Sequence, residues 1–358
     1  MDHNNAGTNI WLLWNVLDSD NRNQIPILAF GYELQETEVF DRRCGEDTEM
    51  KDKDLLVGST GFVGGNLMAS HSFARVCHSS DIHEYFGANP DLCVYSGVPA
   101  AMFLANSNSE ADLEIMRHAI ENIRKINPQK LVLISSIAVY KDSKGRDENS
   151  SMEKCSLSAY GRNRLQLEEW VREDYPDALI VRLPALYGVG LKKNFLYDLH
   201  TIVPSMLNKT KYEELSIKCN LVKEGYTLQN NGFYCLNENV NRYDIKSFFM
   251  TNDFNALSFT DSRSRYQFYN LNRLWDDINK AIDCGITLLN LCTPPVSAKE
   301  VYEHITGDSS WINELDKAPY DYDLHSIHSD KLDGDGYYLC SVQEELDDIK
   351  KFMNTWEE

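Results

Sequence analysis

Basic residues are scarce in this sequence. Lys and Arg together number 35 against 55 Asp and Glu, which gives the 358-residue chain a formal net charge of −20. A protein that binds nucleic acids or anionic membranes through its charge presents a basic face. We therefore expect neither a nucleic-acid nor a membrane partner. An anionic ligand would have to be held locally, by a few Arg or Lys side chains or by backbone N–H groups.

Long apolar runs are also missing. A membrane-spanning helix needs about 20 consecutive apolar residues, and no run in the chain approaches that length. The apolar segment at residues 10–17 is short, is interrupted by Asn15 and follows no basic segment, so it does not resemble a signal peptide. We expect a cytoplasmic protein.

The chain contains nine cysteines but no Cys-x-x-Cys pair. Several of them lie inside apolar runs, which is typical of buried reduced thiols and not of disulfides or a metal site. Cys77 and His78 are adjacent in a predicted strand, where neighbouring side chains face opposite sides. We therefore predict no metal site.

A glycine-rich turn follows a short apolar run at residues 55–57, with glycines at positions 58, 61 and 64. A glycine turn from a buried strand into a helix lets the backbone approach a pyrophosphate, whose charge the helix N-terminus favours. The spacing Gly-x-x-Gly-x-x-Gly differs from the Gly-x-Gly-x-x-Gly fingerprint, and glycine-rich turns occur in many loops. Alone, the motif is weak evidence for dinucleotide binding.

Apolar runs alternate with helical patterns from residue 50 onward. The predicted strands cover residues 55–57, 74–77, 92–95, 131–134, 179–183 and 288–291, and helical spacing covers residues 110–126 and 159–173. Such alternation is typical of βαβ units and predicts an α/β fold with a Rossmann-type, doubly wound parallel sheet. Residues 190–265 are rich in Asn, Tyr, Lys and Glu with weak periodicity, so we expect insertions there and no sheet. A capping box at residues 297–300 predicts a helix start.

Two further motifs contain hydroxyl groups. Ser135 and Ser136 end an apolar strand, and Tyr160 and Arg164 lie four residues apart on a predicted helix, hence on one face. A serine at a strand end can donate a hydrogen bond to a substrate oxygen beside a tyrosine hydroxyl. A free tyrosine has a pKa of about 10, so proton transfer near neutral pH requires a neighbouring cation that favours the phenolate. Without these roles, the tyrosine and arginine would be an ordinary helix pair and the serines would only cap the strand.

Together these motifs resemble the extended short-chain dehydrogenase/reductase superfamily, in its NAD-dependent epimerase/dehydratase branch. The resemblance covers roughly residues 50–355. It depends on the glycine motif, Ser-Ser-x-x-Val-Tyr at 135–140, Tyr-Gly-x-x-Arg-x-x-x-Glu at 160–168, Arg-Leu-Pro-Ala-Leu-Tyr-Gly at 182–188, residues 264–272 and Asn-Leu-Cys-Thr at 290–293. In this order and spacing, the motifs are highly specific.

The resemblance implies a role for each matching residue. Tyr160 would be the acid/base, Ser136 would bind the reacting oxygen, and Arg164 would hold the nicotinamide ribose and favour the phenolate. Asn194 and Arg265 would contact substrate phosphates, although a solvated surface role for Arg265 remains open. The cofactor contacts implied are Gly58, Thr60, Gly61, Phe62, Val63, Gly64, Ser79, Ser80, Asp81, Ile82, Gly97, Tyr160, Arg164 and Pro184.

The chain departs from the family pattern at several of these positions. The family has lysine where this chain has Arg164; arginine supplies a permanent charge but is not expected to release a proton. The second predicted strand ends in Ser79-Ser80, without an acid to accept the ribose 2′-hydroxyl and without a following arginine for a 2′-phosphate. The choice between NAD and NADP stays open. Gln267 and Asn272 replace two family aspartates.

The resemblance also implies a domain organisation. Residues 1–49 would be an N-terminal extension outside the core, residues 50–190 an NAD(P)-binding Rossmann domain, and residues 191–358 a smaller, mixed substrate-binding region with some segments returning to the sheet. A homodimer through the helices at 110–126 and 160–173 is expected.

Two hypotheses for function follow. The first is an NAD(P)-dependent oxidoreductase or epimerase of a sugar nucleotide or a similar hydroxyl or keto substrate. Dehydration is less favoured, because Ile137 and Ala138 stand where dehydratases often have Asp and Glu. The alternative is a catalytically silent NAD(P)-binding protein with a regulatory or structural role, suggested by Arg164.

Overall fold

The computed structural model describes residues 53–229 and 232–356. The expected N-terminal extension, with the apolar segment at 10–17, lies outside the described residues. Within the described ranges, no helix combines the length and the apolar character that a membrane span requires.

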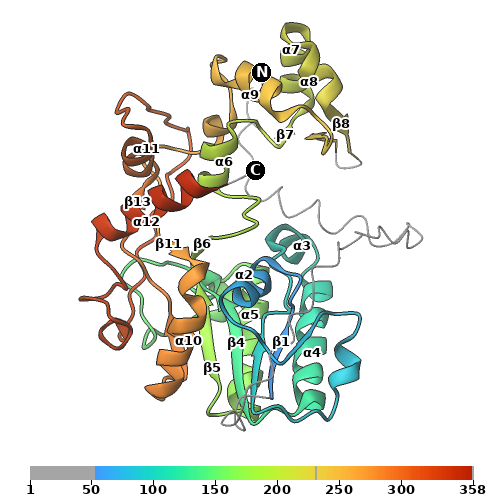
Figure 1. Cartoon of the computed structure of the whole chain (residues 1–358), viewed down its shortest axis with the longest axis vertical. Coiled ribbons are helices and arrows are strands. Elements are labelled where there is room, and N and C mark those ends of the chain that lie inside the picture. Colours follow the sequence, from blue (N-terminus) through green and yellow to red (C-terminus); the bar gives the residue numbers. More distant parts are fainter. Residues whose placement is uncertain (1–52, 230–231, 357–358) are drawn as a thin grey trace, which may run out of the picture.

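A six-stranded parallel sheet forms the centre of the lower half of the molecule (Figure 1). Its strands are β1 (Asp54–Val57), β2 (Arg75–Cys77), β3 (Leu92–Tyr95), β4 (Lys130–Ser136), β5 (Leu179–Leu183) and β12 (Leu288–Asn290). They lie in the order β12-β5-β4-β3-β1-β2, and every neighbouring pair is parallel. This confirms the predicted Rossmann-type α/β fold, with its strands at the predicted positions.

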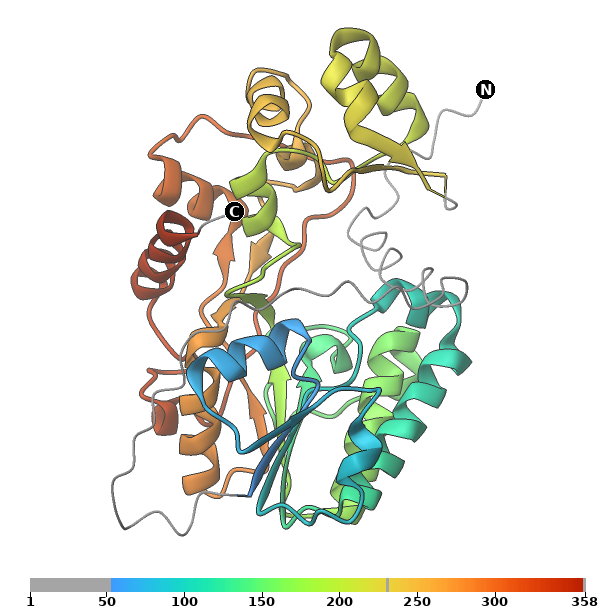
Figure 2. The same cartoon turned by 45° about the vertical axis from the view of Figure 1, so that its right-hand side comes forward.

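Helices cover both faces of this sheet (Figure 2). Helices α4 (Ser109–Ile126) and α5 (Ala159–Asp174) pack on one face, against Leu55 and its neighbours. Helices α2 (Phe62–Ser70) and α10 (Leu274–Asp283) pack on the other, against Leu56 and its neighbours. Successive strand residues face opposite sides, so apolar residues at consecutive positions form a core on each face.

The order in which strands are added to the sheet reverses at β1, because β2 lies on one side of β1 and β3 on the other. The switch point is therefore between β1 and β3. Ligands of open α/β sheets bind at the carboxyl ends of the strands at such a switch point. The connection from β2 to β3 contains the 3₁₀-helix η1 (Ile82–Tyr85) and no α-helix.

A second layer of structure lies above the carboxyl ends of the strands. It contains α6 (Phe195–Thr201), α7 (Lys209–Lys218), α8 (Asn220–Gly225) and α9 (Arg242–Met250), with a small antiparallel sheet of β7 (Met206–Leu207), β9 (Tyr234–Leu236) and β8 (Tyr226–Leu228) (Figure 1). This corrects the expectation that residues 190–265 form no sheet. Strands of two or three residues are too short to give a period in the sequence.

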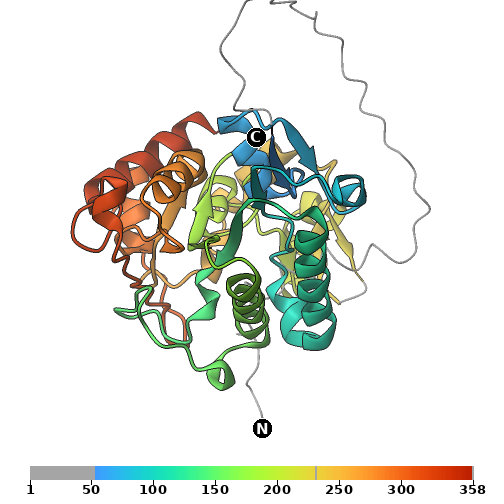
Figure 3. The same ribbon diagram turned by 90° about the horizontal axis from the view of Figure 1, so that it is seen from below.

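The C-terminal region links this layer to the Rossmann sheet. Strand β6 (Ala185–Tyr187) pairs with β11 (Phe268–Asn270), and β10 (Arg265–Tyr266) pairs with β13 (Val296–Ser297). Helix α11 (Ala298–Thr306) begins at the predicted capping box, and packs with α12 (Val342–Thr355). Figure 3 shows this region across the molecule from α4. The remaining elements are α3 (Met102–Ser107), η2 (Ile137–Val139), η3 (Lys154–Ser156), η4 (Ala256–Phe259), η5 (Leu271–Arg273) and η6 (Ser329–Leu332).

The cysteines of the described residues are free thiols, as predicted. Cys77, Cys93, Cys235 and Cys292 are buried. Burial raises the pKa of the Cys235 thiol to about 11, so this group stays protonated at neutral pH.

Candidate cofactor and catalytic site

The glycine motif lies where the chain switches direction in the sheet. Gly58 follows β1 with a φ of +91°, and a Cβ there would lie 2.7 Å from the backbone of Gly97, which follows β3. A Cβ on Gly64 would lie 2.1 Å from the carbonyl oxygen of Gly58. Glycine is therefore required at these positions, because the ends of β1, β3 and α2 approach to backbone contact.

The N-terminus of α2 faces this turn without a capping side chain. Gly61 is the N-cap, with extended backbone angles and no side-chain hydrogen bond to the first turn. Helix N-termini present N–H groups that lack intrahelical acceptors and favour an anion. Thr60 is exposed, and Phe62 and Val63 are half-buried. The backbone N–H groups of this helix start fit the pyrophosphate of a dinucleotide.

The residues predicted to contact the adenosine half of a cofactor lie just after β2. Ser79 and Ser80 are exposed, and Ile82 is buried in the core. The Asp81 carboxylate accepts a hydrogen bond from the His78 backbone (2.8 Å) and pairs with the His78 ring (3.4 Å). Asp81 is therefore engaged within its own turn, and its predicted contact with a cofactor stays a prediction.

The predicted catalytic serine and tyrosine lie on two segments in close contact. A Cβ on Gly161 would lie 2.1 Å from the carbonyl oxygen of Ala138, so the first turn of α5 packs directly on η2. Ser136 ends β4 just before η2, and its hydroxyl accepts a hydrogen bond from the Ala138 backbone (3.2 Å). Tyr160 is 5% exposed, and its backbone N–H donates to the side chain of Asn106 on α3 (3.1 Å).

Arg164 is buried beneath Tyr160 and does not extend into solvent. Its guanidinium carbon lies 4.2 Å from the centre of the Tyr160 ring. One amino group donates to both carboxylate oxygens of Asp112 on α4, at 3.1 and 3.2 Å, and the other donates to the carbonyl oxygen of Pro99 at 2.6 Å. The sequence-based prediction missed Asp112. An acid on the apolar face of a predicted helix was the available indication.

A second buried ion pair supports the strand that ends in the serines. Glu168 accepts hydrogen bonds from Arg182 (3.0 and 2.6 Å) and from the Ser135 hydroxyl (2.6 Å). Arg182 also donates to the Tyr140 hydroxyl (2.7 Å). Burial raises the pKa of Tyr140 to about 12, although the Arg182 charge opposes the shift. Glu168 therefore has a structural role, and Ser135 shares it.

Two asparagines organise the segment above the glycine turn. Asn194 caps α6: its side-chain oxygen accepts from two backbone N–H groups, and its amide donates to the Leu186 carbonyl (2.8 Å). Its predicted contact with a substrate phosphate stays a prediction. Asn66 on α2 was missed; its side chain exchanges two hydrogen bonds of 2.9 Å with the Val189 backbone. Pro184, half-buried between β5 and β6, precedes this segment.

Arg265 lies at the edge of the C-terminal region, far along the chain from the other site residues. Its guanidinium is 3.5 Å from the Asp321 carboxylate, which Lys144 also contacts at 2.9 Å, and both Arg265 and Asp321 are about two-fifths exposed. A phosphate would have to compete with Asp321 for this arginine. Contact with substrate therefore stays a prediction.

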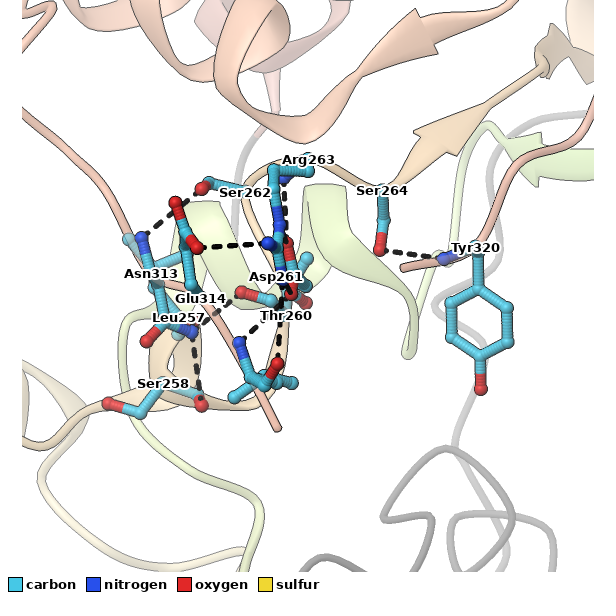
Figure 4. Close-up of polar contacts among 11 residues, drawn as sticks. Leu257, Ser258, Thr260, Asp261, Ser262, Arg263, Ser264, Asn313, Glu314 and Tyr320 are labelled. Atoms are coloured by element: carbon cyan, nitrogen blue, oxygen red, sulfur yellow. Dashed lines mark hydrogen bonds and ion pairs between the residues drawn. The ribbon is translucent and has the colours of Figure 1, made fainter. Parts of the chain in front are cut away.

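Hydrogen bonds and ion pairs connect the segment before Arg265 to residues 313–320 (Figure 4). Asn313 donates to the Thr260 carbonyl (2.7 Å), and Asp261 accepts from the Leu315 backbone (2.9 Å). Arg263 donates to both Asp261 oxygens, at 2.9 and 2.6 Å. The Arg263 hydrogen bonds lower the pKa of Asp261 to about 2, against its burial. This network holds the strand that bears Arg265.

The sheet order and the glycine turn at its switch point define the Rossmann-type fold. In agreement, residues 55–211 match the family model described as the RmlD substrate binding domain. The matched range contains the glycine turn, Ser136, Tyr160 and Arg164. The comparison with curated proteins found no match.

Solved structures resemble the chain in fold at low sequence identity. A dTDP-4-dehydrorhamnose reductase from Yersinia enterocolitica is 15% identical, with a TM-score of 0.56 over 86% of this chain and 100% of that one. A dTDP-4-dehydrorhamnose reductase from Bacillus anthracis, in complex with NADP, is 14% identical with the same TM-score and coverage. RMD from Pseudomonas aeruginosa, complexed with NADPH, is 16% identical, with a TM-score of 0.54 over 85% of this chain and 100% of that one.

Proposed function

We propose that this protein is an NADP(H)-dependent reductase of a keto group on a sugar nucleotide. The observation that carries the proposal is the contact of Gly161 with Ala138, which keeps Tyr160 beside the strand end that bears Ser136. The match of residues 55–211 to the RmlD substrate binding domain supports it. So do the names of the similar structures from Y. enterocolitica and B. anthracis, both dTDP-4-dehydrorhamnose reductases, which favour net reduction over epimerisation.

In this proposal, the glycine turn holds the cofactor. The backbone N–H groups at the start of α2 bind the pyrophosphate, and Gly58 and Gly64 let the end of β1 approach this helix start to backbone contact. When bound, the nicotinamide supplies the hydride. NADP is favoured over NAD because Ser79 and Ser80 are exposed at the end of β2, where the Ser80 hydroxyl shares a hydrogen bond with the His78 ring (2.8 Å) and Asp81 accepts one from the His78 backbone. A 2′-phosphate would accept hydrogen bonds from these serine hydroxyl groups, that of Ser80 in exchange for His78.

In this proposal, Tyr160 supplies the proton and Ser136 binds the oxygen that receives it. Tyr160 donates its hydroxyl proton to the carbonyl oxygen of the substrate as that oxygen gains negative charge, and the Ser136 hydroxyl donates a hydrogen bond to the same oxygen. The Arg164 guanidinium on the Tyr160 ring stabilises the phenolate that remains. At the far end, Arg265 would bind the diphosphate in exchange for Asp321.

The experiment is a cofactor titration followed by a turnover assay of the full chain. NADPH and NADH binding is measured by nucleotide fluorescence, and NADPH oxidation is followed with a panel of nucleoside-diphosphate keto sugars. The proposal predicts tighter binding of NADPH than of NADH and turnover of at least one keto sugar. The proposal is rejected if the protein binds neither cofactor, or if it oxidises NADPH with none of the keto sugars.

A catalytically silent NADP-binding protein is the second candidate, and one observation favours it. The Arg164 guanidinium is engaged with Asp112 and Pro99, where the family pattern has a lysine. If the chain binds NADPH at the glycine turn but oxidises it with no keto sugar, this second function is supported.

A further inference from the structure

An acid lies on the buried face of α4, among the apolar residues that pack against the sheet. Asp112 shares this face with Met116, Ala119 and Ile123. A buried carboxylate is costly unless it is paired, and Asp112 is paired twice. It accepts hydrogen bonds from Arg164 at 3.1 and 3.2 Å and from the Asn163 amide at 2.9 Å. The side chains of Arg164 and Asp112 are only 5% and 7% exposed.

Stability alone does not account for such a pair. Replacing a buried ion pair by well-packed apolar residues is often neutral or stabilising. The geometry around Arg164 indicates another role, because its guanidinium joins three parts of the site. It contacts Asp112 on α4, the ring of Tyr160 on α5 at 4.2 Å, and the carbonyl of Pro99 at 2.6 Å, two residues after Gly97.

We propose that Asp112 is a positioning residue for Tyr160. By holding one amino group of Arg164, it keeps the guanidinium against the tyrosine ring and the other amino group on the Pro99 carbonyl. The ring is thereby placed relative to the glycine turn that would hold the cofactor. The inference rests on the proposed reductase function, since it assigns Asp112 to the proton-transfer site of that reaction.

This arrangement also accounts for arginine at position 164. A guanidinium is planar, presents donors in several directions and packs on aromatic faces. A lysine ammonium is a compact charge on a flexible stem and cannot pack as a plane on Tyr160 while also spanning from Asp112 to Pro99. The acid on α4 and the arginine on α5 therefore form one unit.

The test compares Asp112→Asn with a matched control, Asp277→Asn. Asp277 is also a buried acid in the first turn of a helix: it lies on α10, on the opposite face of the sheet, accepts from the Tyr269 hydroxyl (2.7 Å) and pairs with Arg273 (3.6 Å). We expect Asp112→Asn to lower kcat for the keto sugar about tenfold or more, with KM and the NADPH Kd changed less than about threefold. Asp277→Asn should lower the thermal midpoint similarly and leave kcat within about threefold. An equal loss of kcat in both variants, or none in Asp112→Asn, overturns the proposal.

A double variant tests whether Asp112 acts through Tyr160. In a Tyr160→Phe background, Asp112→Asn should cause no further loss of kcat, because the group that it positions is already gone. If the two losses multiply, Asp112 acts independently of Tyr160 and the proposal is wrong.

A third measurement does not depend on turnover. Tyr160 nitration by tetranitromethane, mapped by mass spectrometry, reports how accessible and how well held the ring is. Asp112→Asn should speed nitration of Tyr160 several-fold over the wild type, and Asp277→Asn should not. An unchanged rate overturns the positioning role even if the wild type reduces no keto sugar. Failure of turnover alone rejects the proposed function and leaves the accelerated nitration as support for the positioning of Tyr160.

Discussion

Gly161 and Ala138 lie so close that a Cβ on the glycine would be 2.1 Å from the alanine carbonyl oxygen. This contact joins the helix of Tyr160 to the turn after Ser136, although the two segments are separated by a long loop. A contact to backbone cannot relax by rotation of a side chain. The separation of the two proposed catalytic groups therefore depends on the absence of a side chain at residue 161.

Gly161→Ala should move α5 away from η2. We expect a loss of about 1–3 kcal/mol in the free energy of unfolding, the usual cost of overpacking, and a larger fall in turnover. Urea denaturation measures the first. Gly65→Ala is the stability control, since a Cβ in that helical position would be 4.0 Å from its nearest contact; it should be neutral or stabilising. Equal stability of the two variants would contradict the close packing.

Gly58→Ala should weaken cofactor binding. The residue combines a φ of +91° with a Cβ that would lie 2.7 Å from the Gly97 backbone, so we expect a loss of NADPH affinity of about tenfold or more, equal to about 1.4 kcal/mol. Gly87→Ala is matched for backbone strain, with a φ of +75° and nothing within 4 Å of the added Cβ. It should bind NADPH as the wild type does. If both variants bind normally, the glycine turn is not the cofactor site.

Arg164→Lys should lower both stability and turnover. Lysine keeps the charge but loses the simultaneous contacts with Asp112, Pro99 and the Tyr160 ring. Breaking a buried pair costs about 3–5 kcal/mol when one partner is removed; retention of the charge makes a smaller loss the expected result. Unfolding and kcat are compared with Arg172→Lys, whose pair with Glu168 on the same helix is partly exposed. Unchanged turnover in Arg164→Lys would show that only the charge is used.

Acid should release the network that holds Arg265. Hydrogen bonds from Arg263 lower the pKa of Asp261 from 3.8 to about 2. Because the folded-state pKa is depressed, the stability that this carboxylate contributes is present above about pH 4 and is lost as the pH falls towards 2. Unfolding midpoints in urea between these pH values should fall more steeply for the wild type than for Asp261→Asn. Parallel curves would contradict the assignment.

The sheet could be predicted because its signal is local. Apolar residues at consecutive positions, such as Leu55 and Leu56, pack on opposite faces, and each run is bounded by turns. The glycine turn, Ser136 and Tyr160 could be proposed as site residues because the spacing of their motifs matches the family pattern that they resemble. Such patterns record local geometry, so they locate the elements of the site but not its internal pairing.

The contacts that could not be predicted join residues far apart in the chain. Asp112 and Arg164 are 52 residues apart, and Asn66 lies 123 residues before Val189. Each side chain alone is an ordinary helix residue, and only the packing of α4 on α5, or of α2 under the segment after β6, supplies its partner. The short strands above the site were missed for a related reason, since they are stabilised by neighbours and not by their own pattern.

The most direct test of the central claim follows the transferred atoms. NADPH carrying deuterium at the transferable position of the nicotinamide is incubated with the full chain and a nucleoside-diphosphate keto sugar, and the sugar is analysed by mass spectrometry. The proposed function predicts one deuterium at the former keto carbon with the wild type, and a rate about 100-fold lower with Tyr160→Phe, as expected when a general acid is removed. Equal transfer by both proteins would contradict the role of Tyr160, and no transfer by the wild type would contradict the reductase.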